Sequence, residues 1–123
     1  MLFRSAQHST AYNGLIEQAA NEQGIPPQLL WSVIKNESSF DPRVVSQKGA
    51  KGLAQFMDAT AAQYGVRDPH DPNQAIPGAA RYLRHLMDKF DGNPRLVAAA
   101  YNSGENRRSL TQGFIPPIKE TRD

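Results

Sequence analysis

Apolar side chains recur at helical spacing over most of the 123-residue chain, and glycine or proline interrupts the pattern at intervals. Residues three and four positions apart share one side of a helix, so this spacing predicts amphipathic helices. We expect helices over residues 11–23, 27–37, 53–64 and 72–90, with a fifth beginning at residue 94. No segment carries a strand pattern of useful length, and there is no internal repeat. The pattern therefore predicts an all-α, mainly helical fold.

One acidic residue ends an apolar stripe. In the second predicted helix, Leu30, Val33 and Ile34 lie on the face that leads to Glu37. A carboxylate so placed is expected to be poorly solvated, which disfavours its charged form and raises its pKa, as a general acid near neutral pH requires. Alternatively, Glu37 simply terminates the helix and turns out to solvent. The stripe alone leaves both interpretations open.

The helical spacing disappears directly after this acid, between residues 38 and 52. Asp41 and Pro42 indicate a turn, and Gly49 and Gly52 lie in what we interpret as an ordered loop. These glycines could be required because the backbone takes positive φ or passes close to a ligand. Alternatively, they are ordinary turn residues. Both interpretations remain open.

The third predicted helix carries an apolar stripe that continues until Gly65. Its apolar positions are Leu53, Phe56, Met57, Ala61 and Tyr64. Gln55 and Thr60 are the polar residues near this stripe. By pattern alone, Phe56 and Met57 are expected in the core.

Two residues invite functional interpretations that their surroundings do not favour. Trp31 flanks the stripe of the second predicted helix, where a lone tryptophan more often packs in the core than holds a sugar. His70 lies between Asp68 and Asp71, which superficially suggests a metal site. However, Asp-Pro pairs are typical of turns and helix starts, and the three histidines lie far apart in sequence. We therefore expect no metal site and no cofactor.

Length and composition narrow the class of protein. A chain of 123 residues with 39% hydrophobic residues suits one compact domain, so we expect a single domain over residues 1–123. No run approaches a membrane span, and residues 1–10 lack the apolar core of a signal peptide. The absence of cysteine excludes disulfides and thiolate metal sites. A net charge of +2 suits an anionic polymer, but no dense basic run supports a nucleic-acid partner.

The candidate chemistry is cleavage of a glycosidic bond. The chain has no G-x-S-x-G, phosphate-loop or H-E-x-x-H motif, so those mechanisms are not supported. Ordinary glycosidases use two carboxylates. Asp41 and Asp58 are the possible partners of Glu37, but the sequence assigns that role to neither.

Three blocks of sequence closely resemble one family, the soluble lytic transglycosylase (SLT) catalytic domain, which is related to goose-type lysozyme. The first block is ESSFDPRVVSQKGAKGLAQFMDATA, residues 37–61. The second is AAYNSG, residues 99–104, and the third is IPPIKET, residues 115–121, in the order expected of the family. The resemblance covers the chain from about residue 25 onward. It implies a lysozyme-like fold with a glycan-binding groove.

The resemblance also implies an activity: cleavage of the β-1,4 bond between N-acetylmuramic acid and N-acetylglucosamine in peptidoglycan, yielding a 1,6-anhydro end. Glu37 matches the family's single acid/base, and the substrate's own N-acetyl group replaces a second carboxylate. Tyr101 matches the tyrosine whose hydroxyl orients that acid. The positions that line or shape the glycan groove in relatives correspond to Ser46, Gln55, Met57, Thr60 and Asn102. For Met57, the resemblance thus weakens the core interpretation without removing it.

The chain departs from the family pattern at Ala54, Phe56 and Asp58, and again at residues 106–108. Asp58 adds a negative charge near the expected groove, which could alter substrate preference or help to position a water. The chain ends at Asp123, where relatives continue, so we interpret it as a domain cut from a longer protein. With no signal peptide in the chain, we expect a wall-degrading module of a bacteriophage particle or secretion machine, acting in the bacterial periplasm or cell wall.

Three alternatives remain. The first is a hydrolytic muramidase of the same fold. The second is a non-catalytic wall-binding or scaffold module of a phage particle or secretion system. A helical DNA-binding domain is the most distant. The expected partners are peptidoglycan glycan strands, together with other domains or subunits of such a particle or machine.

Overall fold

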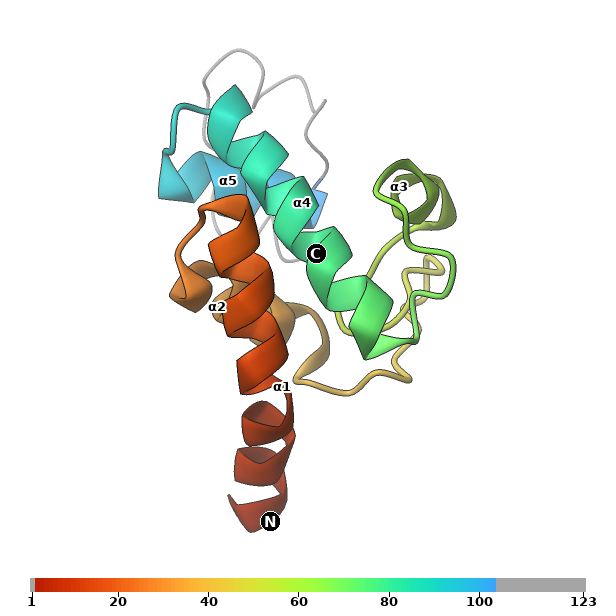
Figure 1. Cartoon of the computed structure of the whole chain (residues 1–123). Coiled ribbons are helices and arrows are strands. Elements are labelled where there is room, and N and C mark those ends of the chain that lie inside the picture. The colour runs from red at the N-terminus through yellow and green to blue at the C-terminus, as the bar shows by residue number, and fades with distance from the viewer. Residues whose placement is uncertain (1, 104–123) are drawn as a thin grey trace. The chain divides into compact units, whose positions relative to one another are not determined.

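The structure, a computed structural model, describes the backbone of residues 2–103 and the side chains of residues 11–103 (Figure 1). The described part contains five helices: α1 (Leu2–Gln23), α2 (Pro27–Ser38), α3 (Asp58–Gln63), α4 (Pro72–Lys89) and α5 (Pro94–Ser103). Within it, extended pairing is limited to two isolated bridges, between Val45 and Lys51 and between Lys51 and Phe56. The prediction of a mainly helical fold is confirmed. The motif at residues 115–121 and the departures at residues 106–108 lie outside the described residues.

The chain divides into two compact units, one of residues 1–82 and one of residues 83–123. The boundary falls within α4, between Tyr82 and Leu83. A single domain over residues 1–123 stays a prediction. None of the helices in the described part of the chain is long and apolar enough to cross a membrane.

In the first unit, α1 and α2 pack against each other and are joined by a tight turn (Figure 1). α1 begins at Leu2, earlier than the predicted start at residue 11. Its buried positions include Ile16 and Ala20, which carry the apolar side that the spacing predicts. α1 ends where Gly24 takes a φ of 67° and the N–H of Ile25 bonds to the carbonyl of Ala20 at 3.0 Å. This is a common way for a helix to end in glycine.

The third helix is shorter than predicted, because residues 53–57 are not helical. Gln55 takes a φ of 54°, which belongs to the left-handed region and interrupts a right-handed helix. Lys51 and Phe56 exchange two backbone hydrogen bonds of 3.0 and 3.1 Å. The apolar spacing at residues 53–57 therefore comes from a bridged turn. Phe56 is buried as predicted, whereas Met57 is 46% exposed and the core interpretation of this residue is wrong.

The part of α4 that belongs to the first unit holds α3 in place. Arg81 is half-buried and donates from both Nε and a terminal nitrogen to the carbonyl of Tyr64, at the end of α3. A cation at a helix C-terminus is favourable because it faces the negative end of the helix dipole. The Tyr82 ring lies 5.1 Å from that of Tyr64 and 6.4 Å from that of Phe56. The short helix α3 thus depends on tertiary contacts for its position.

In the second unit, α5 begins as predicted. The side-chain oxygen of Asn93 accepts hydrogen bonds from the backbone N–H groups of Arg95 at 3.0 Å and Leu96 at 3.3 Å, which is an N-cap followed by a first-turn proline. The buried side chains of α5 are Val97, Ala99 and Ala100. Their small size allows close packing at this helix.

Candidate active site

Glu37 lies in the last turn of α2 and its side chain is half-buried. Three buried apolar residues precede it: Leu30 and Ile34 are fully buried and Val33 is 7% exposed. The acid therefore stands where the apolar stripe meets the surface. Because the Glu37 side chain is half-buried, the alternative that it turns fully out to solvent is wrong.

The end of α2 directly follows the acid. The N–H of Ser39 bonds to the carbonyl of Lys35 at 2.9 Å, and Ser39 and Phe40 both take positive φ values, 51° and 64°. Phe40 returns to the core, where it is 5% exposed. The acid thus lies in the last turn of α2, just before the backbone leaves the helix.

A loop held by side-chain hydrogen bonds follows α2, and Ser46 closes one turn of it. The Ser46 hydroxyl oxygen accepts the N–H of Ala50 at 3.0 Å, and the backbone N–H of Ser46 bonds to the carbonyl of Ala50 at 2.9 Å. Because this side-chain bond uses an oxygen lone pair, the hydroxyl proton can still be donated to a ligand. Ser46 therefore has a structural task in addition to any contact with a glycan.

The two loop glycines serve the backbone. Gly49 and Gly52 take φ values of 93° and 77°, which settles the choice between positive φ and plain punctuation in favour of positive φ. A Cβ on Gly52 would lie 1.8 Å from the carbonyl oxygen of Pro69, whereas one on Gly49 would meet nothing within 4 Å. The close approach at Gly52 is to the backbone of the chain itself.

Gln55 ties together two parts of the same loop. Its side-chain nitrogen donates to the carbonyls of Val44 at 3.1 Å and Gly52 at 2.9 Å. Both amide protons are thereby used, so only the amide oxygen is left for a sugar hydroxyl or N–H. The role implied for Gln55 narrows to that of an acceptor.

Neither candidate for a second carboxylate is free of other partners. The Asp41 carboxylate accepts hydrogen bonds from the backbone N–H of Arg43 at 2.9 Å and its Nε at 3.4 Å. The Asp58 carboxylate lies 3.1 Å from Lys51 Nζ, and its side chain is 81% exposed. This ion pair offsets the negative charge that Asp58 brings to the expected groove.

The remaining expected groove residues in the first unit are near α3. Met57 immediately precedes this helix and is exposed, and Thr60 is half-buried within it. Val45, which the sequence reasoning did not single out, is 55% exposed and bridges to Lys51. Val44 and Val45 are adjacent and lie outside any periodic segment, so the sequence does not indicate which of them faces solvent. An exposed Val45 and Met57 offer apolar contact to a ligand on this loop.

Tyr101 and Asn102 lie on α5, in the second unit. Tyr101 is half-buried and Asn102 is exposed. The predicted contact between the Tyr101 hydroxyl and Glu37 joins two different units and stays a prediction.

His70 has a structural contact. Its Nδ1 lies 2.8 Å from the carbonyl oxygen of Pro42, which joins two loops of the first unit. Among the residues that the structure describes, no three histidine, aspartate or glutamate side chains gather in a way that could hold a metal ion.

The fold agrees with the comparisons to known proteins. Residues 14–113 match the transglycosylase SLT domain family, and the chain belongs to this family. The 70 kDa soluble lytic transglycosylase from Escherichia coli has a similar structure, with a TM-score of 0.73 and 28% sequence identity over 90% of this chain and 22% of that protein. The expectation of a lysozyme-like transglycosylase fold is confirmed.

Particular relatives include two phage proteins. The peptidoglycan transglycosylase gp16 of Escherichia phage T7 is 41% identical over 103 residues, which are 78% of this chain and 8% of that protein. The transglycosylase of Enterobacteria phage PRD1 is 39% identical over 92 residues, 75% of this chain and 34% of that protein. The chain thus spans 8% and 34% of the length of these two relatives.

Proposed function

We propose that this chain is a peptidoglycan lytic transglycosylase in which Glu37 is the single general acid and base. The observation that carries the proposal is the placement of Glu37 at the end of the buried stripe of α2, directly before the ordered loop of residues 39–57. Membership of the SLT family and the similarity to proteins named as transglycosylases support it.

The reaction begins with protonation of the leaving group. Glu37 donates its proton to the glycosidic oxygen as the bond from that oxygen to C1 of N-acetylmuramic acid breaks. The carbonyl oxygen of the substrate's N-acetyl group bonds to C1 in its place, so no second carboxylate is required. This agrees with the engagement of Asp41 in its own turn and of Asp58 with Lys51.

The second step closes a ring within the sugar. The C6 hydroxyl attacks C1, the bond from C1 to the acetyl oxygen breaks, and the hydroxyl proton goes to the Glu37 carboxylate. Glu37 is again protonated and no water is consumed, so the product is a 1,6-anhydro end. Tyr101 acts as a positioning residue for Glu37, while Ser46, Gln55, Met57, Thr60 and Asn102 contact the glycan.

Digestion of purified peptidoglycan sacculi tests this proposal. The wild type should release fragments with anhydro ends, which mass spectrometry separates from reducing ends because they are lighter by one water. Glu37→Gln should lower the rate by about 10²- to 10⁴-fold, the usual contribution of a general acid or base. Glu22→Gln makes the same change at an exposed position of α1 and should retain the wild-type rate.

Two outcomes would contradict the proposal. Reducing ends in place of anhydro ends would indicate a hydrolytic muramidase of the same fold. Undiminished wall clearance by a folded Glu37→Gln variant would exclude this residue as the acid and would favour a non-catalytic wall-binding module.

We also propose that the domain acts at the bacterial cell wall as part of a larger assembly, a phage particle or secretion machine. The two phage relatives, each much longer than this chain, support this proposal. Detection of the chain in purified virions by mass spectrometry would test it.

A further inference from the structure

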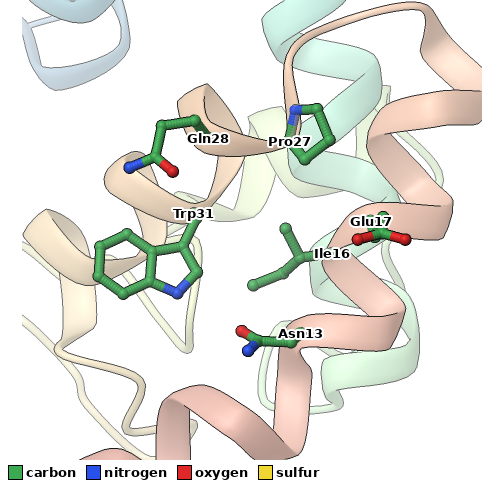
Figure 2. A pocket seen from close by; sticks show the side chains of 6 residues that line it. All are labelled: Asn13, Ile16, Glu17, Pro27, Gln28 and Trp31. Atoms are coloured by element: carbon green, nitrogen blue, oxygen red, sulfur yellow. The ribbon is translucent and has the colours of Figure 1, made fainter.

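A hollow of about 300 Å³ lies on the first unit between α1 and α2 (Figure 2). Its lining residues are Asn13, Ile16, Glu17, Pro27, Gln28 and Trp31. Trp31 and Glu37 are six residues apart on α2, which places them roughly 9 Å apart along the axis and about 120° apart around it. The hollow and Glu37 therefore lie on different sides of α2.

The walls of the hollow combine apolar surface, neutral polar groups and the carboxylate of Glu17. Ile16, 2% exposed, and Pro27 supply aliphatic surface, and Trp31 adds an indole ring. In Figure 2, the Asn13 amide and the ring edge that carries the indole nitrogen of Trp31 border the same space. Within the described part of the chain, no hydrogen bond is recorded for the side chains of Asn13 and Gln28. These groups can donate to and accept from a ligand.

The indole ring is held in place by its neighbours. The Phe40 ring, itself buried, lies 5.3 Å from the Trp31 ring at an angle of 52°. The ammonium group of Lys35 lies 5.3 Å from the ring centroid. Trp31 is half-buried, so the expectation that it belongs to the core holds only for part of the ring. A ring fixed in this way can bind a ligand with little loss of side-chain entropy.

The chemistry of this lining indicates the class of ligand. No lysine or arginine lines the hollow, so it does not suit a phosphate or another anion. Two side-chain amides, an indole N–H, the acceptor oxygens of Glu17 and apolar walls suit an uncharged ligand that has both hydroxyl or amide groups and an apolar face. An N-acetylhexosamine has these features, and the hollow lies at the small end of the usual size range for ligand sites.

We propose that this hollow is a second glycan site, which binds one N-acetylhexosamine of the wall polymer while another part of the polymer occupies the cleavage site. This inference rests on the proposed function for its substrate class. A second site of this kind raises the local concentration of the polymer at the enzyme, even when its own affinity is weak.

Trp31 is the single tryptophan of the chain, so its fluorescence reports directly on the hollow. The test titrates the Glu37→Gln variant with N-acetylglucosamine tetramer and follows tryptophan emission. We expect a saturable change. Asn13→Ala and Gln28→Ala should each raise the dissociation constant about fivefold, which corresponds to the loss of one hydrogen bond.

Matched controls come from α1. Asn21→Ala and Gln18→Ala remove the same side-chain types from exposed positions of α1 outside the hollow, and they should titrate like the parent. A saturable change that is identical in all variants would place the sugar elsewhere and overturn the inference. No saturable change, or a response to the free stem peptide but not to the sugar, would also overturn it.

The product analysis of sacculi separates this inference from the proposed function. Anhydro products without a fluorescence response would support the proposed transglycosylase activity and contradict the second glycan site. A fluorescence response with the expected variant pattern, but without anhydro products, would support the second glycan site and contradict the proposed reaction.

Discussion

Gly52 offers a sharp test of how the loop beside the candidate acid is built. Its φ is 77°, and a Cβ at this position would lie 1.8 Å from the carbonyl oxygen and 2.7 Å from the carbonyl carbon of Pro69. Contacts under 3.0 Å essentially never occur for a real Cβ, and the obstacle here is backbone, which cannot rotate away. Gly52→Ala must therefore displace the segment around Pro69 or the loop itself.

Gly49 separates the two causes of destabilisation. Its φ of 93° imposes a similar conformational cost on alanine, but a Cβ there meets nothing within 4 Å. We expect Gly49→Ala to lower the free energy of unfolding by about 1–2 kcal/mol, the cost of a left-handed alanine. Gly52→Ala adds overpacking, which typically costs a further 1–3 kcal/mol, so its total is about 2–5 kcal/mol.

Urea denaturation followed by circular dichroism measures both variants, with the midpoint and the slope compared to the wild type. The result that would refute this reasoning is an equal loss of stability in the two variants. In that case the close approach to Pro69 would contribute nothing, and positive φ alone would explain both glycines.

Two further predictions concern polar contacts. Gln55→Ala should lower the free energy of unfolding by about 1–3 kcal/mol, because it removes two side-chain hydrogen bonds and leaves the carbonyls of Val44 and Gly52 with one backbone donor each. Gln47→Ala, at an exposed position of the same loop, should change this free energy by less than about 0.5 kcal/mol, and similar losses in both variants would contradict the prediction. In α4, the hydrogen bond from Arg84 lowers the pKa of the Asp88 carboxyl. A depressed folded-state pKa stabilises the protein above the unfolded pKa, and this contribution is lost as the pH falls through the folded value. An NMR titration should place the Asp88 midpoint below that of an ordinary aspartate and return it toward normal in Arg84→Gln, whereas a midpoint that Arg84→Gln does not move would exclude the pair as the cause.

The sequence predicted helices best where the local signals were complete. At the start of α5, Asn93 followed by proline determined both the cap and the first turn, and the observed helix begins there. Proline at residue 72 and the long apolar stripe likewise gave the bounds of α4 almost to the residue. These signals depend on neighbouring residues alone, which is why a single sequence was sufficient.

The start of α3 could not be predicted in this way. The apolar spacing of Leu53, Phe56 and Met57 fits a helix, but it also fits a bridged turn in which Gln55 takes positive φ. The hydrogen bond that favours the turn reaches Val44, eleven residues earlier in the chain. A contact of this range leaves no periodic signal, so the pattern placed Met57 in the core whereas the structure exposes it.

The residues that a wall polymer would meet after Glu37 are therefore shaped by polar contacts rather than by a helix. Ser46 and Gln55 hold the loop through Ala50, Val44 and Gly52, while their remaining polar atoms are able to face a ligand. Substitution of either residue should consequently change stability and activity together. Met57, for which we propose only a contact with the glycan, is exposed, so its substitution should change substrate affinity with little effect on unfolding. Measuring both quantities for each variant would separate the residues that build the groove from those that only line it.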